Sequence, residues 1–323
     1  MNPVRNIIQK AIRKSGEPYN ILMPGFDGFF ENMVSRTGNN VYVLPANSRY
    51  EWQIGLPPKN RECIVLRDME NVPIDLAIDF VLCNDRTIQY DMCIKMAHAM
   101  HIPLIMFEHF DSITRIKPDQ LGLIARAQPY DLHLSASKLI AKSWNIEDST
   151  VIGYGIHEYP TITEKDEDLV LMVGEYGDTD LQIVGALVNA IPNLRIIGNN
   201  KGMTENIRNQ YEIDDLIKKA SIFINFSTEG RIKPQLLQAM ANRCAIVSNN
   251  LPILGEILNK DNSILCTSVD QFTRGVAKLN ADSAFRTKLA EKGRLASEYL
   301  NIETFSSKLN EALDKLSTKV YTR

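Results

Sequence analysis

A polar loop between two apolar segments carries the side chains best suited to bind an anionic ligand. The stretch "SIFINFS" at 221–227 has the pattern of a buried strand, and "PQLLQAMAN" at 234–242 has the pattern of a helix. Between them lie Glu229, Arg231 and Lys233. The start of a helix has unpaired N–H groups and a partial positive charge, so it attracts anions. The spacing therefore predicts an anion site at this loop, with an acid that can accept hydrogen bonds from hydroxyl groups.

Polar residues and glycines also follow the other predicted strands. In the first half these are Gly25, Asp27, Gly28, Asn84, Asp85, Arg86, Glu108, His109 and Ser135. In the second half they are Gly174, Glu175, Tyr176, Gly198, Asn199, Asn200, Ser227, Asn249 and Asn250. Open parallel sheets bind ligands outside the carboxyl ends of their strands, so we expect a ligand in a cleft between two facing sheets. For Asp85 and Arg86 the sequence predicts only a local ion pair, and Asp27 fits either an acceptor-side base or a helix N-cap.

The elements that must position these residues alternate between strand and helix patterns. Strand patterns occur at "YNILM", "VYVLP", "CIVLR", "LAIDFVLCND", "PLIMFEHF", "DLHLSAS" and "TVIGYGIH" in the first half. The alternation restarts with "LVLMVGEYG" after a polar segment at 158–168, which we interpret as a linker. Such alternation predicts an α/β fold with two doubly wound, Rossmann-like domains. We assign 1–157 to the first domain, 158–302 to the second, and 303–323 to a helix that packs back on the first domain.

Composition narrows the class of protein. The 323 residues include 36 Lys and Arg against 39 Asp and Glu, so net charge gives no global case for nucleic-acid binding. Five scattered cysteines without a Cys-x-x-Cys pair argue against a disulfide scaffold and a zinc site, and favour buried thiols in the cytoplasm. No apolar run reaches the length of a membrane span. Residues 3–14 predict an amphipathic helix whose basic face is solvated or contacts a membrane or nucleic acid.

Several catalytic signatures are missing from the sequence. There is no Gly-x-Gly-x-x-Gly fingerprint, no Walker loop, no His-Glu-x-x-His metal motif and no Gly-x-Ser-x-Gly elbow. These absences argue against dinucleotide-dependent dehydrogenases, P-loop enzymes, zinc proteases and serine hydrolases.

Five segments follow one another in the second half, over about residues 168–267: "LVLMVGEYG", "NLRIIGNN", "ASIFINFSTEG", "LLQAMANRCAIVS" and "PILGEIL". In these segments and their order, the second half resembles the donor domain of GT-B glycosyltransferases, and within them the retaining family 4. The strand "TVIGYGIH" is similar to the one that closes the family's first domain. The first half is similar only in its layout.

The resemblance implies roles for the matching residues. Glu229 would meet the hydroxyls of the transferred sugar, His109 would lie near that sugar, and Asp27 would serve the acceptor side. The implied donor-binding residues are Gly25, Gly28, Gly174, Glu175, Asn199, Arg231, Lys233, Gln238 and Glu256.

Two departures from the family pattern concern the donor. The family's ribose-binding acid is replaced by Gln238, one residue further from Glu229 than usual. The usual Arg and Lys near the first donor-domain strand are absent from "VGEYGDTDLQ", so Arg231 and Lys233 are the candidate phosphate cations.

The resemblance implies transfer of a sugar from a nucleotide sugar, with a UDP-sugar as first choice, to an acceptor hydroxyl. We expect retention of anomeric configuration, no metal and no cofactor besides the co-substrate. The acceptor could be a glycan, a lipid carrier or a small molecule. An alternative is DNA carrying hydroxylated pyrimidines, as for phage enzymes of this fold, because basic residues of the first half are interleaved with Tyr50 and Trp52. Further alternatives are a non-catalytic nucleotide-sugar-binding protein and a phosphatase or epimerase.

Overall fold

The computed structural model describes residues 16–25, 28–44, 61–66, 76–117, 128–156, 164–174, 178–198, 210–228 and 230–321. The chain divides into two compact units. Unit 1 comprises Met1–Gly155 and Ile302–Arg323, and unit 2 comprises Ile156–Asn301. The basic helix expected at 3–14 lies outside the described residues, and so do Asp27, Tyr50, Trp52, Glu175, Asn199 and Glu229.

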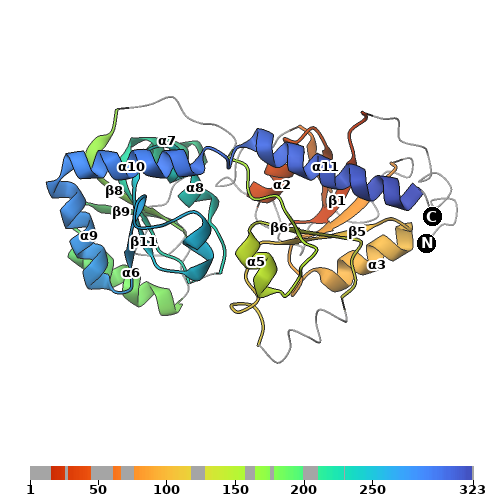
Figure 1. The fold of residues 1–323 in the computed structure, drawn as a ribbon, viewed down its shortest axis with the longest axis horizontal. Coiled ribbons are helices and arrows are strands. Elements are labelled where there is room, and N and C mark those ends of the chain that lie inside the picture. The colour runs from red at the N-terminus through yellow and green to blue at the C-terminus, as the bar shows by residue number, and fades with distance from the viewer. Residues whose placement is uncertain are drawn as a thin grey trace. The chain divides into compact units, whose positions relative to one another are not determined.

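The described strands of unit 1 form one seven-stranded sheet in the order β3-β2-β1-β4-β5-β6-β7 (Figure 1). The strands are β1 (Asn20–Pro24), β2 (Asn40–Leu44), β3 (Cys63–Val65), β4 (Phe80–Cys83), β5 (Leu104–Glu108), β6 (Leu132–Ser135) and β7 (Thr150–Val151). The described helices are α2 (Phe29–Ser35), α3 (Tyr90–Met100), α5 (Lys138–Ser143) and α11 (Ile302–Tyr321). All strand pairs of this sheet are parallel. Every residue of β5 is buried, as expected for a parallel strand covered on both faces.

The last helix of the chain, α11, belongs to unit 1 although it follows unit 2 in sequence (Figure 1). Asn310 on α11 accepts a hydrogen bond of 2.7 Å from Asn39 Nδ2, and Asp314 accepts one from the Tyr19 hydroxyl. Leu309 and Leu313 of α11 are fully buried. The helix therefore contributes apolar side chains to the interior of unit 1.

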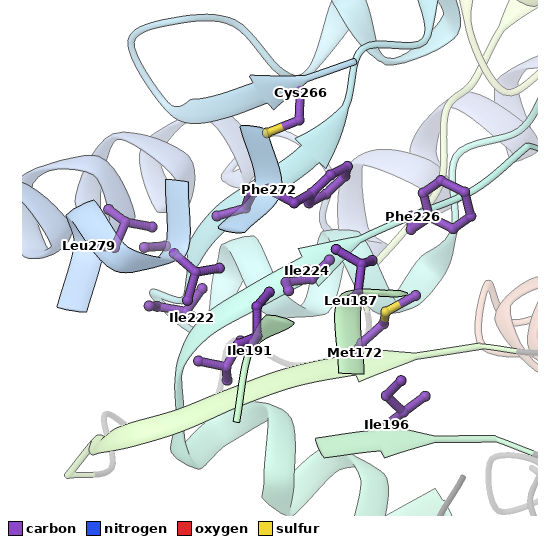
Figure 2. Packing of buried hydrophobic residues seen from close by; sticks show 14 of the residues in the cluster. Met172, Leu187, Ile191, Ile196, Ile222, Ile224, Phe226, Cys266, Phe272 and Leu279 are labelled. Carbon is purple, nitrogen blue, oxygen red and sulfur yellow. The ribbon is translucent and has the colours of Figure 1, made fainter. Parts of the chain in front are cut away.

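The described strands of unit 2 form a five-stranded parallel sheet in the order β12-β11-β10-β8-β9. The strands are β8 (Asp166–Val173), β9 (Leu194–Ile197), β10 (Ala220–Asn225), β11 (Ala245–Asn249) and β12 (Ser263–Cys266). The helices are α6 (Asp178–Ala190), α7 (Gln210–Lys219), α8 (Pro234–Ala241), the 3₁₀ helix η2 (Pro252–Glu256), α9 (Val269–Ala281) and α10 (Ser283–Ser297). One core packs Met172 and Ile224 of the sheet against Leu187 of α6 and Phe272 of α9 (Figure 2).

The predicted α/β class with doubly wound parallel sheets is confirmed in both units. All five cysteines are free thiols and buried, as predicted. The linker predicted at 158–168 is wrong at its end, because β8 already begins at Asp166. The first three residues of β8 are exposed, and Asp166 pairs with Ala220 of β10. Backbone pairing extends this strand beyond the core, and hydrophobicity does not reveal such an extension.

The sheet order fixes where a ligand site is expected in each unit. In unit 1 the chain order reverses between β1 and β4, and in unit 2 it reverses between β8 and β10. Crevices outside the carboxyl ends of two such strands are the usual ligand sites of open α/β sheets. Among the described residues, no helix is both long enough and apolar enough to span a membrane.

Candidate functional site

In unit 2 the reversal point brings the end of β8, at Gly174, beside the loop that follows β10. Hydrogen bonds hold this loop in place. The side chain of Asn249, at the end of β11, accepts from Ser227 N at 3.3 Å and donates to Ser227 O at 2.6 Å. The Thr228 hydroxyl donates to Asp180 of α6 at 2.9 Å. Two neighbouring elements thus fix the start of the loop that carries the candidate cations.

Helix α8 begins immediately after this loop, with Lys233 as its N-cap and Pro234 in its first turn. Proline suits this position because its missing N–H would have no partner inside the helix. The Lys233 side chain accepts no hydrogen bond from the first N–H groups of the helix, and the first turn contains no acid. Lys233 is only 8 % exposed, and Arg231 is half-buried. The positive end of the helix and two cationic side chains therefore gather in one place, which favours a bound anion.

The amide of Gln238, on α8, donates to a carboxylate of the neighbouring helix. Gln238 Nε2 lies 3.3 Å from Asp214 Oδ1 on α7. Gln210 Nε2, also on α7, lies 2.7 Å from the same oxygen. Sequence reasoning singled out neither Asp214 nor Gln210, because both fall in an amphipathic helical pattern with charged neighbours.

The other predicted donor residues of unit 2 occupy simpler surroundings. The backbone N–H of Gly174 donates to Ile197 O at 2.9 Å, which joins the ends of β8 and β9. Glu256 ends η2 and is exposed. Burial, and secondarily the charge of Glu256, raise the pKa of Tyr299.

In unit 1 the ends of β1 and β4 are tied together at the reversal point. Gln89 Nε2 donates to Gly25 O at 3.1 Å, and Asn84 Nδ2 donates to Pro24 O at 3.2 Å. Gly25 N donates to Leu44 O at 2.6 Å. Gly28 is the N-cap of α2 with φ of 72°, a backbone conformation that glycine adopts at little cost. The two predicted glycines therefore lie where β1 ends and where α2 begins.

His109 directly follows β5 and is held by aromatic rings. It is 2 % exposed, and its Nδ1 lies 2.7 Å from the Tyr154 hydroxyl. Its ring lies 4.4 Å from the ring of Phe30 in an edge-on arrangement and 4.4 Å from that of Phe107. Because Tyr154 engages Nδ1, a ligand contact by His109 would have to use Nε2.

Arg86 and Glu108 form a buried ion pair beside His109, with Nε and Oε1 2.5 Å apart. His133 Nε2 lies 3.7 Å from the same Glu108 oxygen. The expected pair between Asp85 and Arg86 is wrong, because Asp85 pairs instead with Arg115 at 2.6 Å. Asp85 and Arg86 both follow the end of β4 and pair with different partners, so their adjacency in the sequence did not predict an ion pair between them.

The described residues contain no group of three or more His, Cys, Asp or Glu side chains that could hold a metal ion. The predicted site residues thus fall into two described groups. Gly174, Arg231, Lys233, Gln238 and Glu256 lie in unit 2, and Gly25, Gly28 and His109 lie in unit 1.

Comparison with known proteins places the fold. The chain matches no protein-family model and no curated protein sequence. Among solved structures, sucrose-phosphate synthase from Thermosynechococcus elongatus is similar with a TM-score of 0.72 at 12% identity, covering 93% of this chain and 100% of that one. HepE from Anabaena in complex with UDP-glucose is similar with a TM-score of 0.69 at 12% identity, covering 92% of this chain and 99% of that one. A glycosyltransferase from Rickettsia africae ESF-5 is similar with a TM-score of 0.62 at 10% identity, covering 93% of this chain and 98% of that one.

These similarities extend over nearly the whole length of this chain and of each of the three proteins. They agree with the order of strands and helices in both units. The fold suggested by the sequence resemblance is therefore confirmed: the chain has the GT-B fold of glycosyltransferases.

Proposed function

We propose that the protein is a glycosyltransferase that moves a sugar from a nucleotide sugar, with a UDP-sugar as first choice, to an acceptor hydroxyl. The observation that carries the proposal is the start of α8, where Lys233 is the N-cap and is only 8 % exposed, and Arg231 precedes it by two residues. Cationic side chains at the positive end of a helix favour an anion at that point. HepE, which has the same fold, is described in complexes with UDP-glucose and UDP.

The leaving group of such a reaction is a nucleoside diphosphate, on which negative charge develops as the bond to the sugar breaks. Preorganised donors and cations that face this charge lower the barrier. In this proposal Arg231, Lys233 and the first N–H groups of α8 supply them. We also propose that the diphosphate needs no divalent metal and that the sugar keeps its anomeric configuration. A cytoplasmic location completes the proposal, supported by five buried free thiols.

On the sugar side, the proposal keeps the roles that the resemblance implies. Glu229 accepts hydrogen bonds from the sugar hydroxyls, and His109 contacts the sugar through Nε2. Packing against Phe30 and Phe107 would fix the orientation of this imidazole before the sugar arrives.

Thermal shift with UDP and UDP-glucose tests donor binding, with wild type beside Lys233→Gln and Arg231→Ala. A ligand at 100 times its Kd stabilises the native state by about 2.7 kcal/mol, so the melting temperature of wild type should rise. The two variants should lose most of this rise. Lys260→Ala, which removes an exposed lysine of unit 2, is the control and should keep it. A rise that persists in both site variants would show that α8 is not the phosphate site.

Turnover separates an enzyme from a binding protein. Wild type is incubated with UDP-glucose and one acceptor at a time: a glycan, a sugar alcohol, a lipid carrier or hydroxymethylated DNA. It should release UDP in the presence of its acceptor, and Glu229→Ala should abolish this release. Transfer to DNA should fall steeply with salt, which would support the DNA alternative. Two Asp-x-Asp patterns, at 166–168 and 178–180, make a chelator control necessary. Loss of activity in EDTA with recovery in Mn²⁺ or Mg²⁺ would refute metal independence, and binding without turnover would refute the transferase.

A further inference from the structure

The hydroxyl group that contacts His109 comes from the segment that leads out of unit 1. Tyr154 lies three residues after the end of β7 and two residues before Ile156, with which unit 2 begins. Its hydroxyl lies 2.7 Å from His109 Nδ1, and the two rings are stacked with their centres 5.7 Å apart. Tyr154 is 8 % exposed. The contact is therefore buried, and it joins two residues that are 45 positions apart in the sequence.

The backbone on both sides of Tyr154 is held by contacts within unit 1. Gly153 N donates to Ser135 O at 3.4 Å, at the end of β6. Gly153 has a φ of 78°, a conformation that glycine adopts at little cost. On the other side, a Cβ added to Gly155 would lie 2.9 Å from Ile302 Cα, so the chain packs directly on the start of α11. These contacts hold the Tyr154 ring in a defined place beside the imidazole.

Apolar packing fixes the plane of the His109 ring but leaves one choice open. A half-turn about the Cβ–Cγ bond exchanges Nδ1 with Cδ2 and Nε2 with Cε1, while the outline of the ring hardly changes. The rings of Phe30 and Phe107, each 4.4 Å away, carry no hydrogen-bonding group that could distinguish these two orientations. A hydroxyl at 2.7 Å does distinguish them, because it bonds to a nitrogen and not to a carbon. Tyr154 therefore selects one of the two orientations.

The same contact determines which ring nitrogen carries the proton. A neutral imidazole has one N–H donor and one acceptor nitrogen, whereas a phenol can donate or accept. A phenol O–H is more acidic than an imidazole N–H, so the favoured arrangement has the Tyr154 hydroxyl donating to Nδ1 of His109. The proton of the neutral ring then lies on Nε2. His109 would thus offer a hydrogen-bond donor to a sugar.

We propose that Tyr154 is a positioning residue for sugar transfer, which holds the His109 imidazole with Nε2–H directed at an oxygen atom of the transferred sugar. The inference rests on the proposed function, from which it takes the contact between His109 and the sugar. Tyr154 itself acts through His109 and does not touch the sugar. It supplies what aromatic packing cannot specify, namely which nitrogen faces the sugar and whether that nitrogen donates or accepts.

Tyr154→Phe tests the proposal, because it removes the hydroxyl and keeps the stacked ring. The kcat of UDP release from UDP-glucose, with the acceptor that the turnover assay identifies, should fall about three- to tenfold, as for the loss of one hydrogen bond. The affinity for UDP, measured by calorimetric titration, should stay unchanged. Tyr90→Phe is the matched control. Tyr90 is also a buried tyrosine of unit 1, and its hydroxyl donates to Pro129 O at 2.9 Å, so this variant should keep the wild-type kcat.

A double-mutant cycle shows whether Tyr154 acts through His109. His109→Ala should lower kcat, and adding Tyr154→Phe to it should lower kcat no further, because the imidazole that the hydroxyl holds is already gone. An equal fall in kcat with and without His109 would show that Tyr154 acts independently, and would overturn the proposal.

Nitrogen-15 spectra of the imidazole side chains report the proton position without substrate. The chain has five histidines, and the signals lost in His109→Ala identify those of His109. In wild type, Nδ1 should lack a proton and Nε2 should carry one. Tyr154→Phe should change these two signals, and Tyr90→Phe should leave them as in wild type. A proton on Nδ1 of wild type would overturn the assignment, and this measurement does not depend on whether any variant folds.

The outcomes separate this inference from the proposed function. If wild type releases UDP, but Tyr154→Phe has the same kcat as Tyr90→Phe or the proton lies on Nδ1, the role of Tyr154 is wrong and the proposed function stands. If wild type releases no UDP with any acceptor of the panel, the proposed function fails and the inference fails with it.

Discussion

Replacing Arg86 with methionine tests how the end of β5, and with it His109, is held in unit 1. The Arg86 side chain is 1% exposed and its partner Glu108 is 4% exposed. The guanidinium carbon also lies 5.5 Å from the centre of the Tyr130 ring and 5.2 Å from that of Trp144. Methionine fills much of this space but leaves the Glu108 carboxylate buried without its cation. Breaking a buried pair in this way costs about 3–5 kcal/mol.

Tryptophan fluorescence can follow unit 1 alone during urea unfolding, because both tryptophans of the chain, Trp52 and Trp144, fall within its residue range. With a slope of about 2 kcal/mol per molar urea, a loss of about 4 kcal/mol lowers the midpoint by about 2 M. Arg61→Met is the control. Arg61 is almost fully exposed and pairs with Glu62 in the same unit, so its replacement should leave the urea midpoint close to that of wild type.

A second substitution separates charge from packing. Arg86→Met combined with Glu108→Gln removes both charges and should recover a large part of the lost stability, since no uncompensated carboxylate is left. Equal midpoints for Arg86→Met and Arg61→Met would refute the reasoning about the buried pair. A double variant as unstable as Arg86→Met alone would show that packing against the aromatic rings, and not charge, stabilises this region.

Two further predictions concern unit 2 and the junction with α11. Burial lowers the pKa of the Lys165 ammonium group below its ordinary 10.5. The contribution of Lys165 to the free energy of unfolding is therefore complete above pH 10.5, and it is lost as the pH falls through the lowered pKa of the folded state. The free energy of unfolding, followed by circular dichroism of the whole chain, should therefore rise with pH up to about 10.5 less steeply in Lys165→Met than in wild type. Parallel curves for the two proteins would contradict this. Gly155→Ala should cost about 1–3 kcal/mol, because the added Cβ would lie 2.9 Å from Ile302 Cα. Gly255→Ala, where the Cβ meets no atom within 4 Å, is its calorimetric control, and an equal loss in both variants would contradict the packing argument.

The strand and helix order could be predicted because each buried parallel strand is a short apolar run bounded by polar residues. Strand β10 and helix α8 are examples, since one is buried throughout and the other shows a clear helical stripe. The start of β8 could not be predicted in this way, because its exposed charged residues pair only through the backbone. The ion pairs of unit 1 could not be predicted from the sequence either. Arg86 and Glu108 are 22 residues apart, and Asp85 and Arg115 are 30 apart, so only the completed sheet brings them together.

The surroundings of Gln238 show why site chemistry is harder to read than fold. A pattern along one helix reveals partners three or four residues apart, so it contains the pair Gln210 and Asp214. Asp214 and Gln238 are 24 residues apart and meet only because α7 packs on α8. When only the sequence of α8 is considered, the glutamine at position 238 looks like the loss of a ligand-binding acid. With α7 in place, the acid lies within hydrogen-bonding distance of that glutamine, and a second acid at 238 would repel it. Position 238 must therefore be judged together with position 214, and a sequence related to this one that carries an acid at 238 should lack the acid at 214.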